Sequence, residues 1–212
     1  MSDVLEVSDE ALAHLTKADD RMAELIEQHG PLDLEARRRG RPAEPYGALL
    51  RSIVGQQLSV AAARTIYDRL IDLFGGSPPS PRELLEVDAE TLRSVGLSRP
   101  KVSYLRSLAQ HVEDGELHLD SLDEMTDEDV IAELTAVKGL GEWTAHMFLM
   151  FHLRRADILP VGDQGIRRAV ERLYGLEEIP DAETLERLGE RWRPYRSLAC
   201  LYLWRSLDNA PG

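Results

Sequence analysis

A tight turn between two predicted helices is the segment best suited to bind an anion. Lys138 precedes Gly139-Leu140-Gly141, and a helix is expected to begin at once, over 142–153. Glycine tolerates positive φ and places no side chain over the backbone N–H groups. The amides at the helix start would point outward at the positive end of the helix dipole, so the turn could bind a phosphate beside Lys138. A Gly-x-Gly turn alone is equally compatible with an ordinary helix–helix connection, with Leu140 filling the core between the helices.

Asp163 is the second candidate, and it lies 20 residues beyond Trp143. It directly precedes a predicted helix over 164–174, where aspartate is a common N-cap. A helix N-terminus also helps to keep a carboxylate ionised at neutral pH. Asp163 can therefore cap the helix, supply an anion for chemistry, or do both.

Other residue types that support metal binding or redox chemistry are sparse. His146 and His152 lie six residues apart on one predicted helix, a spacing that does not suit a pair of metal ligands. The single cysteine, Cys200, lies in an apolar stretch, which excludes a disulfide framework, a four-thiolate zinc site and a cysteine-held iron–sulfur cluster. No metal-ligand cluster or Walker motif is present, so no cofactor is expected to be required.

The elements that must position these residues all read as helices. Apolar residues recur at helical spacing over 11–28 and from Tyr46 to Val54, and no stretch shows the alternation of a strand. Ser59 is a predicted N-cap, and Ser80 with Glu83 forms a predicted capping box. The fold class is therefore all-α with short connections. Further helices are expected over about 60–74, 82–87, 89–95, 99–112, 126–137, 142–153, 164–174, 182–191 and 195–207.

Composition describes an ordinary globular chain, but its charge is unevenly placed. The 212 residues include 25 Lys and Arg against 38 Asp and Glu, a net charge of −13 that argues against nucleic acid as a partner. However, residues 112–133 hold ten acids and no Lys or Arg, whereas 135–173 carry a local excess of +2, and arginines cluster over 37–41. The acidic charge could thus lie away from a DNA-binding face. A membrane span and a secretory signal are not expected.

Four motifs in a fixed order, with a fifth near the C-terminus, carry a family resemblance. Over about residues 45–207 the chain resembles the helix-hairpin-helix DNA glycosylase superfamily, and within it the DNA-3-methyladenine glycosylase II (AlkA-type) branch. The motifs are Ile53–Val60, Val95–Ser98 with Lys101, the hairpin over 134–152, Leu159–Asp163 and Arg191–Ser197.

The resemblance implies a two-lobed helical fold with a cleft between the lobes. A helical bundle over 46–163 would carry the hairpin, and residues 1–45 with 164–212 would form a discontinuous second lobe. The implied activity is that of a monofunctional DNA glycosylase, which hydrolyses the N-glycosidic bond of alkylated purines in base excision repair. The implied partner is double-stranded DNA with alkylated bases, bound by a monomer in the cytoplasm (the bacterial nucleoid) or the nucleus.

The resemblance also assigns the chemistry. Asp163 matches the essential carboxylate, which would stabilise the oxocarbenium character of C1′ as the base leaves. Trp143 stands where lyase-competent relatives carry a catalytic lysine, so no Schiff base can form and the abasic site stays uncut. Trp143, Tyr195, Met147 and Trp192 are the expected base-pocket residues. Tyr195 replaces a tryptophan and Met147 a tyrosine of the best-known pattern, so a less aromatic pocket with a shifted substrate range is expected.

The remaining implied residues contact DNA. Gln57 is expected to fill the gap left by the everted nucleotide, with Leu58 as the fallback. The phosphate-contacting residues would be Lys101, Lys138, Gly139, Gly141 and Thr144. Family hairpins often bind a monovalent cation, Na⁺ or K⁺, through backbone carbonyls near 137–142.

Three alternatives remain open. The chain could be a glycosylase for another lesion, such as hypoxanthine or an oxidised purine. It could be a non-catalytic helix-hairpin-helix module that binds DNA, or a helical scaffold for protein interactions.

Overall fold

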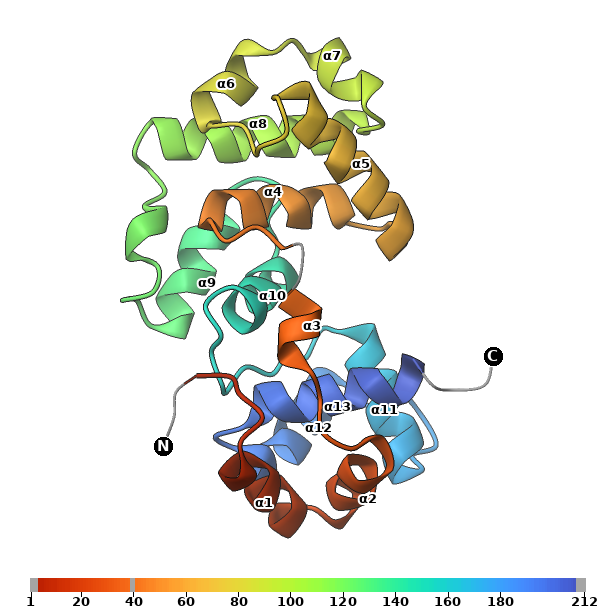
Figure 1. Cartoon of the computed structure of the whole chain (residues 1–212). Helices are drawn as coiled ribbons and strands as arrows, with labels where there is room; N and C mark the ends of the chain where they lie inside the picture. The colour runs from red at the N-terminus through yellow and green to blue at the C-terminus, as the bar shows by residue number, and fades with distance from the viewer. Residues whose placement is uncertain (1–3, 39–40, 209–212) are drawn as a thin grey trace. The chain divides into compact units, whose positions relative to one another are not determined.

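The computed structural model describes residues 4–38 and 41–208. Within these ranges the chain forms 13 α-helices, two short 3₁₀ helices and one isolated antiparallel bridge between Val4 and Arg155 (Figure 1). The predicted all-α class is therefore confirmed. Arg39, one of the predicted arginine cluster, lies outside the described residues. No helix of the described ranges is long and apolar enough to cross a membrane.

The described residues divide into two compact units, which we call the continuous unit (41–148) and the discontinuous unit (4–38 with 149–208). The chain passes from one unit to the other inside helix α10 (Glu142–Phe151). The expected boundary at 163 is thus wrong, because the chain changes unit fifteen residues earlier. Asp163 consequently belongs to the discontinuous unit.

The continuous unit is organised around the long helix α8. This helix packs against α4, α6 and α7 (Figure 1), and Leu105 and Leu108 on α8 are fully buried, as are Leu50 and Ile53 on α4. Its elements are α4 (Pro45–Gly55), α5 (Val60–Leu73), α6 (Pro81–Glu86), α7 (Ala89–Ser94), α8 (Arg99–Glu113), the 3₁₀ helix η1 (Leu119–Ser121), α9 (Asp127–Ala136) and the start of α10.

Helix caps in this unit follow the sequence closely. The Ser59 side chain accepts a hydrogen bond from the Ala62 amide at the start of α5. Ser80 and Glu83 form the predicted capping box at the start of α6. Helix α5 ends where Gly75 and Gly76 adopt φ of 78° and 94°, a backbone conformation that glycine takes readily.

The discontinuous unit packs its C-terminal helix against helices from both ends of the chain. Helix α13 contacts α2 and α11, and α1 contacts α2 and η2. Tyr202 on α13 is fully buried and donates a hydrogen bond to the Gly30 carbonyl. The elements are α1 (Asp9–Ala18), α2 (Asp20–His29), α3 (Leu34–Arg38), α11 (Gln164–Tyr174), α12 (Ala182–Gly189), η2 (Glu190–Trp192) and α13 (Arg196–Asp208).

The expectation of one helix over 11–28 is wrong, because Asp19 separates two helices, α1 and α2. Its backbone is extended, with φ of −155°, so it ends α1 and caps α2 by accepting from the Arg21 and Met22 amides. Its other carboxylate oxygen accepts from the Tyr174 hydroxyl and from the Trp192 indole N–H at 2.9 Å. Buried apolar residues continue at helical spacing on both sides of this point, Ala11 and Leu15 on α1 and Met22 and Leu25 on α2, and so the periodicity concealed the break.

Candidate functional site

The predicted hairpin is present, and its two glycines have different reasons to be glycine. Gly139 has φ of 99°, and a Cβ there would lie 2.2 Å from the Tyr104 ring. Gly141 has open space, because a Cβ there would meet no atom within 4 Å. Leu140 is buried as expected, and its amide donates to the Val137 carbonyl at 3.0 Å. Packing thus demands the first glycine, while the second leaves the backbone at the start of α10 accessible.

The polar residues of the hairpin divide between surface and core. Lys138 is exposed beside the turn, where it can add charge to the positive end of the α10 dipole. Thr144, expected to contact DNA, is only 3% exposed, so its side chain belongs to the packing of α10 rather than to a DNA-facing surface. The exposed Glu142 lies one turn before His146, with a carboxylate oxygen 3.9 Å from the imidazole Nε2.

The loop after α4 is tied to the hairpin. The Gln56 side chain donates to the Gly139 carbonyl at 2.8 Å, so this glutamine bridges the two segments. The next residue, Gln57, is exposed and has φ of 57°, in the left-handed region that costs a non-glycine residue about 1 kcal/mol. Leu58 follows and is 38% exposed. The fold therefore holds Gln57 outward at the tip of a loop in an uncommon conformation.

Lys101, expected to contact a DNA phosphate, contacts the protein backbone in this structure. Its ammonium donates to the Val54 carbonyl near the end of α4 at 2.7 Å, and burial lowers its pKa. Lys101 therefore holds the end of α4, from which the Gln57 loop starts.

Helix α10 carries a row of large side chains at a spacing of four residues. Trp143 is 45% exposed, whereas Met147 and Phe151 are half-buried. Residues four apart share a face of a helix. The same face thus begins with an accessible indole beside the turn and ends with Phe151 in the discontinuous unit.

Asp163 both caps a helix and meets a tryptophan. Its Oδ1 accepts from the Ile166 amide at 2.8 Å and from the Trp204 indole N–H at 3.0 Å. The residue is 9% exposed. A Cβ at Gly165 would lie 3.0 Å from Asp163 Oδ1 and 3.2 Å from the Trp204 ring. Two donors on one oxygen fix the orientation of the carboxylate, and Gly165 provides the room for this arrangement.

Trp204 was not predicted as a site residue. Its ring stacks on Phe151, with centroids 6.0 Å apart and an interplanar angle of 28°. Two spacings could have indicated the pair: Phe151 continues the row from Trp143 on α10, and Trp204 lies two helical turns beyond Ser197 on α13.

Two predicted base-pocket aromatics lie instead in the interior of the discontinuous unit. Trp192 is fully buried, and its indole N–H donates to Asp19. Tyr195 is also buried, with its ring edge-on to His14 at 5.3 Å. Burial, followed by a hydrogen bond to Glu10 and by the charges of nearby carboxylates, raises the pKa of the Tyr195 hydroxyl. Their placement does not fit a base pocket, because both rings pack against the N-terminal helices and their neighbours.

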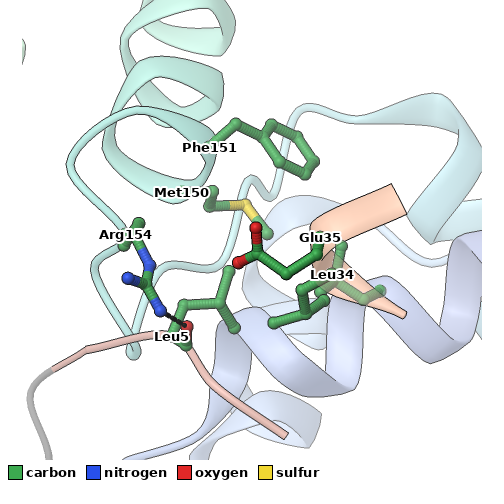
Figure 2. Close-up of a pocket in the computed structure, with 7 residues that line it drawn as sticks. Leu5, Leu34, Glu35, Met150, Phe151 and Arg154 are labelled. Carbon is green, nitrogen blue, oxygen red and sulfur yellow. Dashed lines mark hydrogen bonds between the residues drawn. The ribbon is translucent and has the colours of Figure 1, made fainter. Parts of the chain in front are cut away.

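A small cavity of about 30 Å³ lies in the discontinuous unit beside Phe151 (Figure 2). The volume suits a water molecule or a methyl group. Its walls are mostly apolar, with the Glu35 carboxylate directed toward Met150 and the Arg154 guanidinium donating to the Leu5 carbonyl. The lining residues are Leu5, Leu34, Glu35, Met150, Phe151, Arg154 and Leu201.

Residues 4–38 and 41–208 contain no group of three His, Cys, Asp or Glu side chains placed to hold an ion.

Comparison with known proteins agrees with this geometry. DNA-3-methyladenine glycosylase 1 of Schizosaccharomyces pombe is 32% identical over 209 residues, covering 95% of this chain and 92% of the relative. A Bacillus subtilis relative named for the same activity, YfjP, is 32% identical over 169 residues, and the chain spans 59% of its length.

Solved structures give the same result. The S. pombe 3-methyladenine DNA glycosylase Mag1, in complex with abasic DNA, superposes with a TM-score of 0.84 at 31% identity, covering 95% of this chain and 98% of that one. A DNA-3-methyladenine glycosidase from Bacillus halodurans gives 0.81 at 41% identity, covering 95% and 90%. Residues 50–194 match the model of one family. The chain belongs to the HhH-GPD superfamily of base excision DNA repair proteins.

Proposed function

We propose that this protein is a monofunctional DNA glycosylase that excises alkylated purines of the 3-methyladenine type by hydrolysing the N-glycosidic bond. The observation that carries the proposal is the Asp163 carboxylate, held at a helix start by the Ile166 amide and the Trp204 indole. The activity for which the S. pombe and B. subtilis relatives are named supports it.

Asp163 would act on the sugar. As the base leaves, C1′ gains positive charge, and an oriented carboxylate nearby stabilises that charge without reorganisation. Glycosidases use a second carboxyl group to protonate a poor leaving group. A purine alkylated on a ring nitrogen is already cationic and leaves readily, so one carboxylate is enough.

The hairpin and the Gln57 loop would handle the DNA backbone and the everted nucleotide. The open backbone at Gly141 and the charge of Lys138 suit a phosphate. Extrusion of a nucleotide costs a few kcal/mol, and the exposed side chain of Gln57 would fill the gap it leaves, with Leu58 beside it. Lys101 would contribute indirectly, by holding the end of α4.

The base would bind where the aromatic groups are reachable. Trp143 is the accessible indole of the α10 row, and a cationic purine on its face gains about 0.5–2 kcal/mol from cation–π attraction. Met147, one turn further along α10, is the next large side chain that we assign to the base region.

A single assay tests this function. Methylated duplex DNA is incubated with the enzyme, and free base and strand breaks are measured in the same sample. Released 3-methyladenine or 7-methylguanine without nicking is the expected result, because Trp143 cannot form a Schiff base. Strand cleavage by the enzyme, or no base release at any ionic strength at which the DNA is bound, would contradict the proposal.

A glycosylase for another lesion is the second candidate, and the interior positions of Tyr195 and Trp192 favour it. With those rings packed inside the discontinuous unit, the base region is poorer in aromatic groups than the family pattern implies. A neutral lesion would depend less on cation–π attraction. Comparing release of 3-methyladenine, 7-methylguanine and hypoxanthine from defined duplexes decides between them.

A sodium or potassium ion at the turn is also part of the proposal. Such an ion prefers oxygen ligands, and the turn offers neutral carbonyls. The Val137 carbonyl accepts from Leu140 and the Gly139 carbonyl from Gln56, and each retains a second lone pair. These two carbonyl oxygens are suitable ligands for a weakly bound ion. No chemical step of base release depends on such an ion. Replacing K⁺ by a tetraalkylammonium ion would weaken DNA binding and leave the excision rate of bound DNA unchanged.

We further propose that the protein acts as a monomer in the compartment that holds the DNA, the bacterial nucleoid or the nucleus. Sedimentation at micromolar concentration, with and without a short duplex, tests the first point.

A further inference from the structure

The C-terminal motif Arg191–Ser197 remains unexplained by base binding, since its aromatic rings are buried. Its polar side chains contact the segment that leads to Asp163. This segment, residues 155–163, lies in the connection between the end of α10 and the start of α11. Both the motif and the segment lie in the discontinuous unit.

Ser197, at the second position of α13, is fully buried and makes three hydrogen bonds to this segment. Its hydroxyl donates to the Arg155 carbonyl at 2.7 Å and accepts from the Ile158 amide at 3.0 Å. Its amide donates to the Ala156 carbonyl at 3.0 Å. One side chain and one amide thus satisfy the backbone polar groups of three neighbouring residues.

Arg196 holds the same place through Asp157. Its guanidinium donates to both carboxylate oxygens, Nε to Oδ1 at 2.7 Å and Nη2 to Oδ2 at 3.0 Å, and to the Asp157 carbonyl at 2.6 Å. The Arg196 and Asp157 side chains are 15% and 25% exposed. A bidentate contact that also includes the backbone carbonyl fixes the orientation of Asp157 relative to Arg196 as well as their distance.

The segment is therefore attached to α13 at two points. Residues 155–158 are held by Arg196 and Ser197, and Asp163 is held by Trp204, about 12 Å further along the helix at 1.5 Å per residue. Six residues can span up to about 20 Å, so the covalent chain alone does not fix the distance between Asp163 and Trp204. That distance also depends on the packing of α13 against α11, which Asp163 caps, and on the first attachment point, which sets where the segment leaves α13.

We propose that Asp157, Arg196 and Ser197 are positioning residues that set the Asp163 carboxylate against Trp204. The inference rests on the proposed function for its kinetic consequence, because a misplacement of about 1 Å can lower a rate by on the order of a hundredfold.

Three variants test the proposal in the full-length protein. Asp157→Asn removes the charge pair, Arg196→Lys keeps the charge but loses the fork, and Ser197→Ala removes the hydroxyl. Each is expected to lower the single-turnover rate of base release by on the order of ten- to a hundredfold, with the Kd for lesion DNA changed by less than about twofold.

Arg193→Gln is the matched control. Arg193 also contacts Asp157, at 2.7 Å, and contacts Glu190 at 3.1 Å. Its side chain is 48% exposed. Losing this ion pair should leave the rate within about twofold of wild type, as is usual for exposed pairs.

The indole N–H resonances provide a readout that does not depend on activity. The chain has three tryptophans, so the Trp204 signal can be assigned with Trp204→Phe. The Trp204 N–H resonance should shift in Arg196→Lys and Ser197→Ala, while the Trp143 resonance keeps its chemical shift. In Arg193→Gln the Trp204 resonance should be unchanged. An unmoved Trp204 signal in both variants, or an equal shift in Arg193→Gln, overturns the proposal. If the wild type releases no base, the proposed function fails, whereas the indole measurement still decides the positioning.

Discussion

Replacing Asp163 by asparagine isolates the charge of the carboxylate from its structural work. The carboxamide oxygen of asparagine can accept from the Ile166 amide and the Trp204 indole as Oδ1 does now. Asparagine is also as good an N-cap as aspartate. The free energy of unfolding should therefore change by less than about 0.5 kcal/mol, while the anion is lost.

The expected kinetic effect follows from the electrostatics of a nearly buried site. At an effective dielectric constant of about 20, unit charges about 4 Å apart attract by about 4 kcal/mol. The positive charge on C1′ is only partly developed, so between half and all of this energy applies. At about 1.4 kcal/mol per tenfold in rate, base release should slow by about thirty- to a thousandfold.

Single-turnover release of 7-methylguanine, measured with DNA affinity and thermal unfolding, is the assay. Asp163→Ala is the companion variant, because it also removes the cap and leaves the Trp204 N–H without its carboxylate. It should cost about 2–3 kcal/mol of stability. An Asp163→Asn enzyme with a rate within a factor of about three of wild type would refute the electrostatic role. Unchanged DNA affinity with no activity to lose would point to a non-catalytic binding module.

Three further outcomes test the hairpin, the indole and a surface cap. Gly139→Ala should destabilise the protein by more than about 2 kcal/mol, because its Cβ would clash with the Tyr104 ring at a positive φ. Gly141→Ala should keep stability within about 0.5 kcal/mol but weaken DNA binding; equal urea midpoints for the two variants would contradict this reading. Trp204→Phe keeps a ring against its aromatic neighbour and loses the N–H, so base release should fall about tenfold, and a wild-type rate would exclude an orienting role. Hydrogen bonds from Thr184 lower the pKa of Asp181 in the folded protein. The Asp181 carboxylate therefore stabilises the fold above its unfolded pKa of about 3.9, and this stabilisation is lost as the pH falls through the lower folded value. The urea midpoint should thus fall between about pH 5 and 2, less so in Asp181→Asn, and parallel profiles would contradict the assignment.

Helix positions could be predicted where local chemistry decides them. Ser59 and the Ser80–Glu83 box mark helix starts through side-chain hydrogen bonds within one turn, and such local contacts are visible in the sequence. The break at Asp19 was missed because its partners, Tyr174 and Trp192, lie more than 150 residues away.

The candidate site shows the same difference between local features, which the sequence displays, and long-range contacts, which it does not. Short-range spacing and the family motif single out the hairpin glycines and Asp163, and their roles on DNA stay predictions. The burial of Trp192 and the contact of Lys101 with the Val54 carbonyl could not be predicted, because the sequence does not show whether an aromatic ring faces the surface or whether an ammonium donates to a carbonyl. Trp204 was overlooked because its contact with Asp163 crosses 41 residues of chain.

The shared carboxylate of Asp19 sets a lower limit on how far the protein can be shortened. A fragment trimmed to the family-matched stretch would lack this acceptor and also helices α1 and α2, which bury Leu15, Met22 and Leu25. Each such apolar side chain contributes about 1.5–3 kcal/mol on burial, a large share of the 5–15 kcal/mol that typically separates folded from unfolded chains. Helices α1 and α2, with Asp19 between them, are thus a structural requirement of the discontinuous unit.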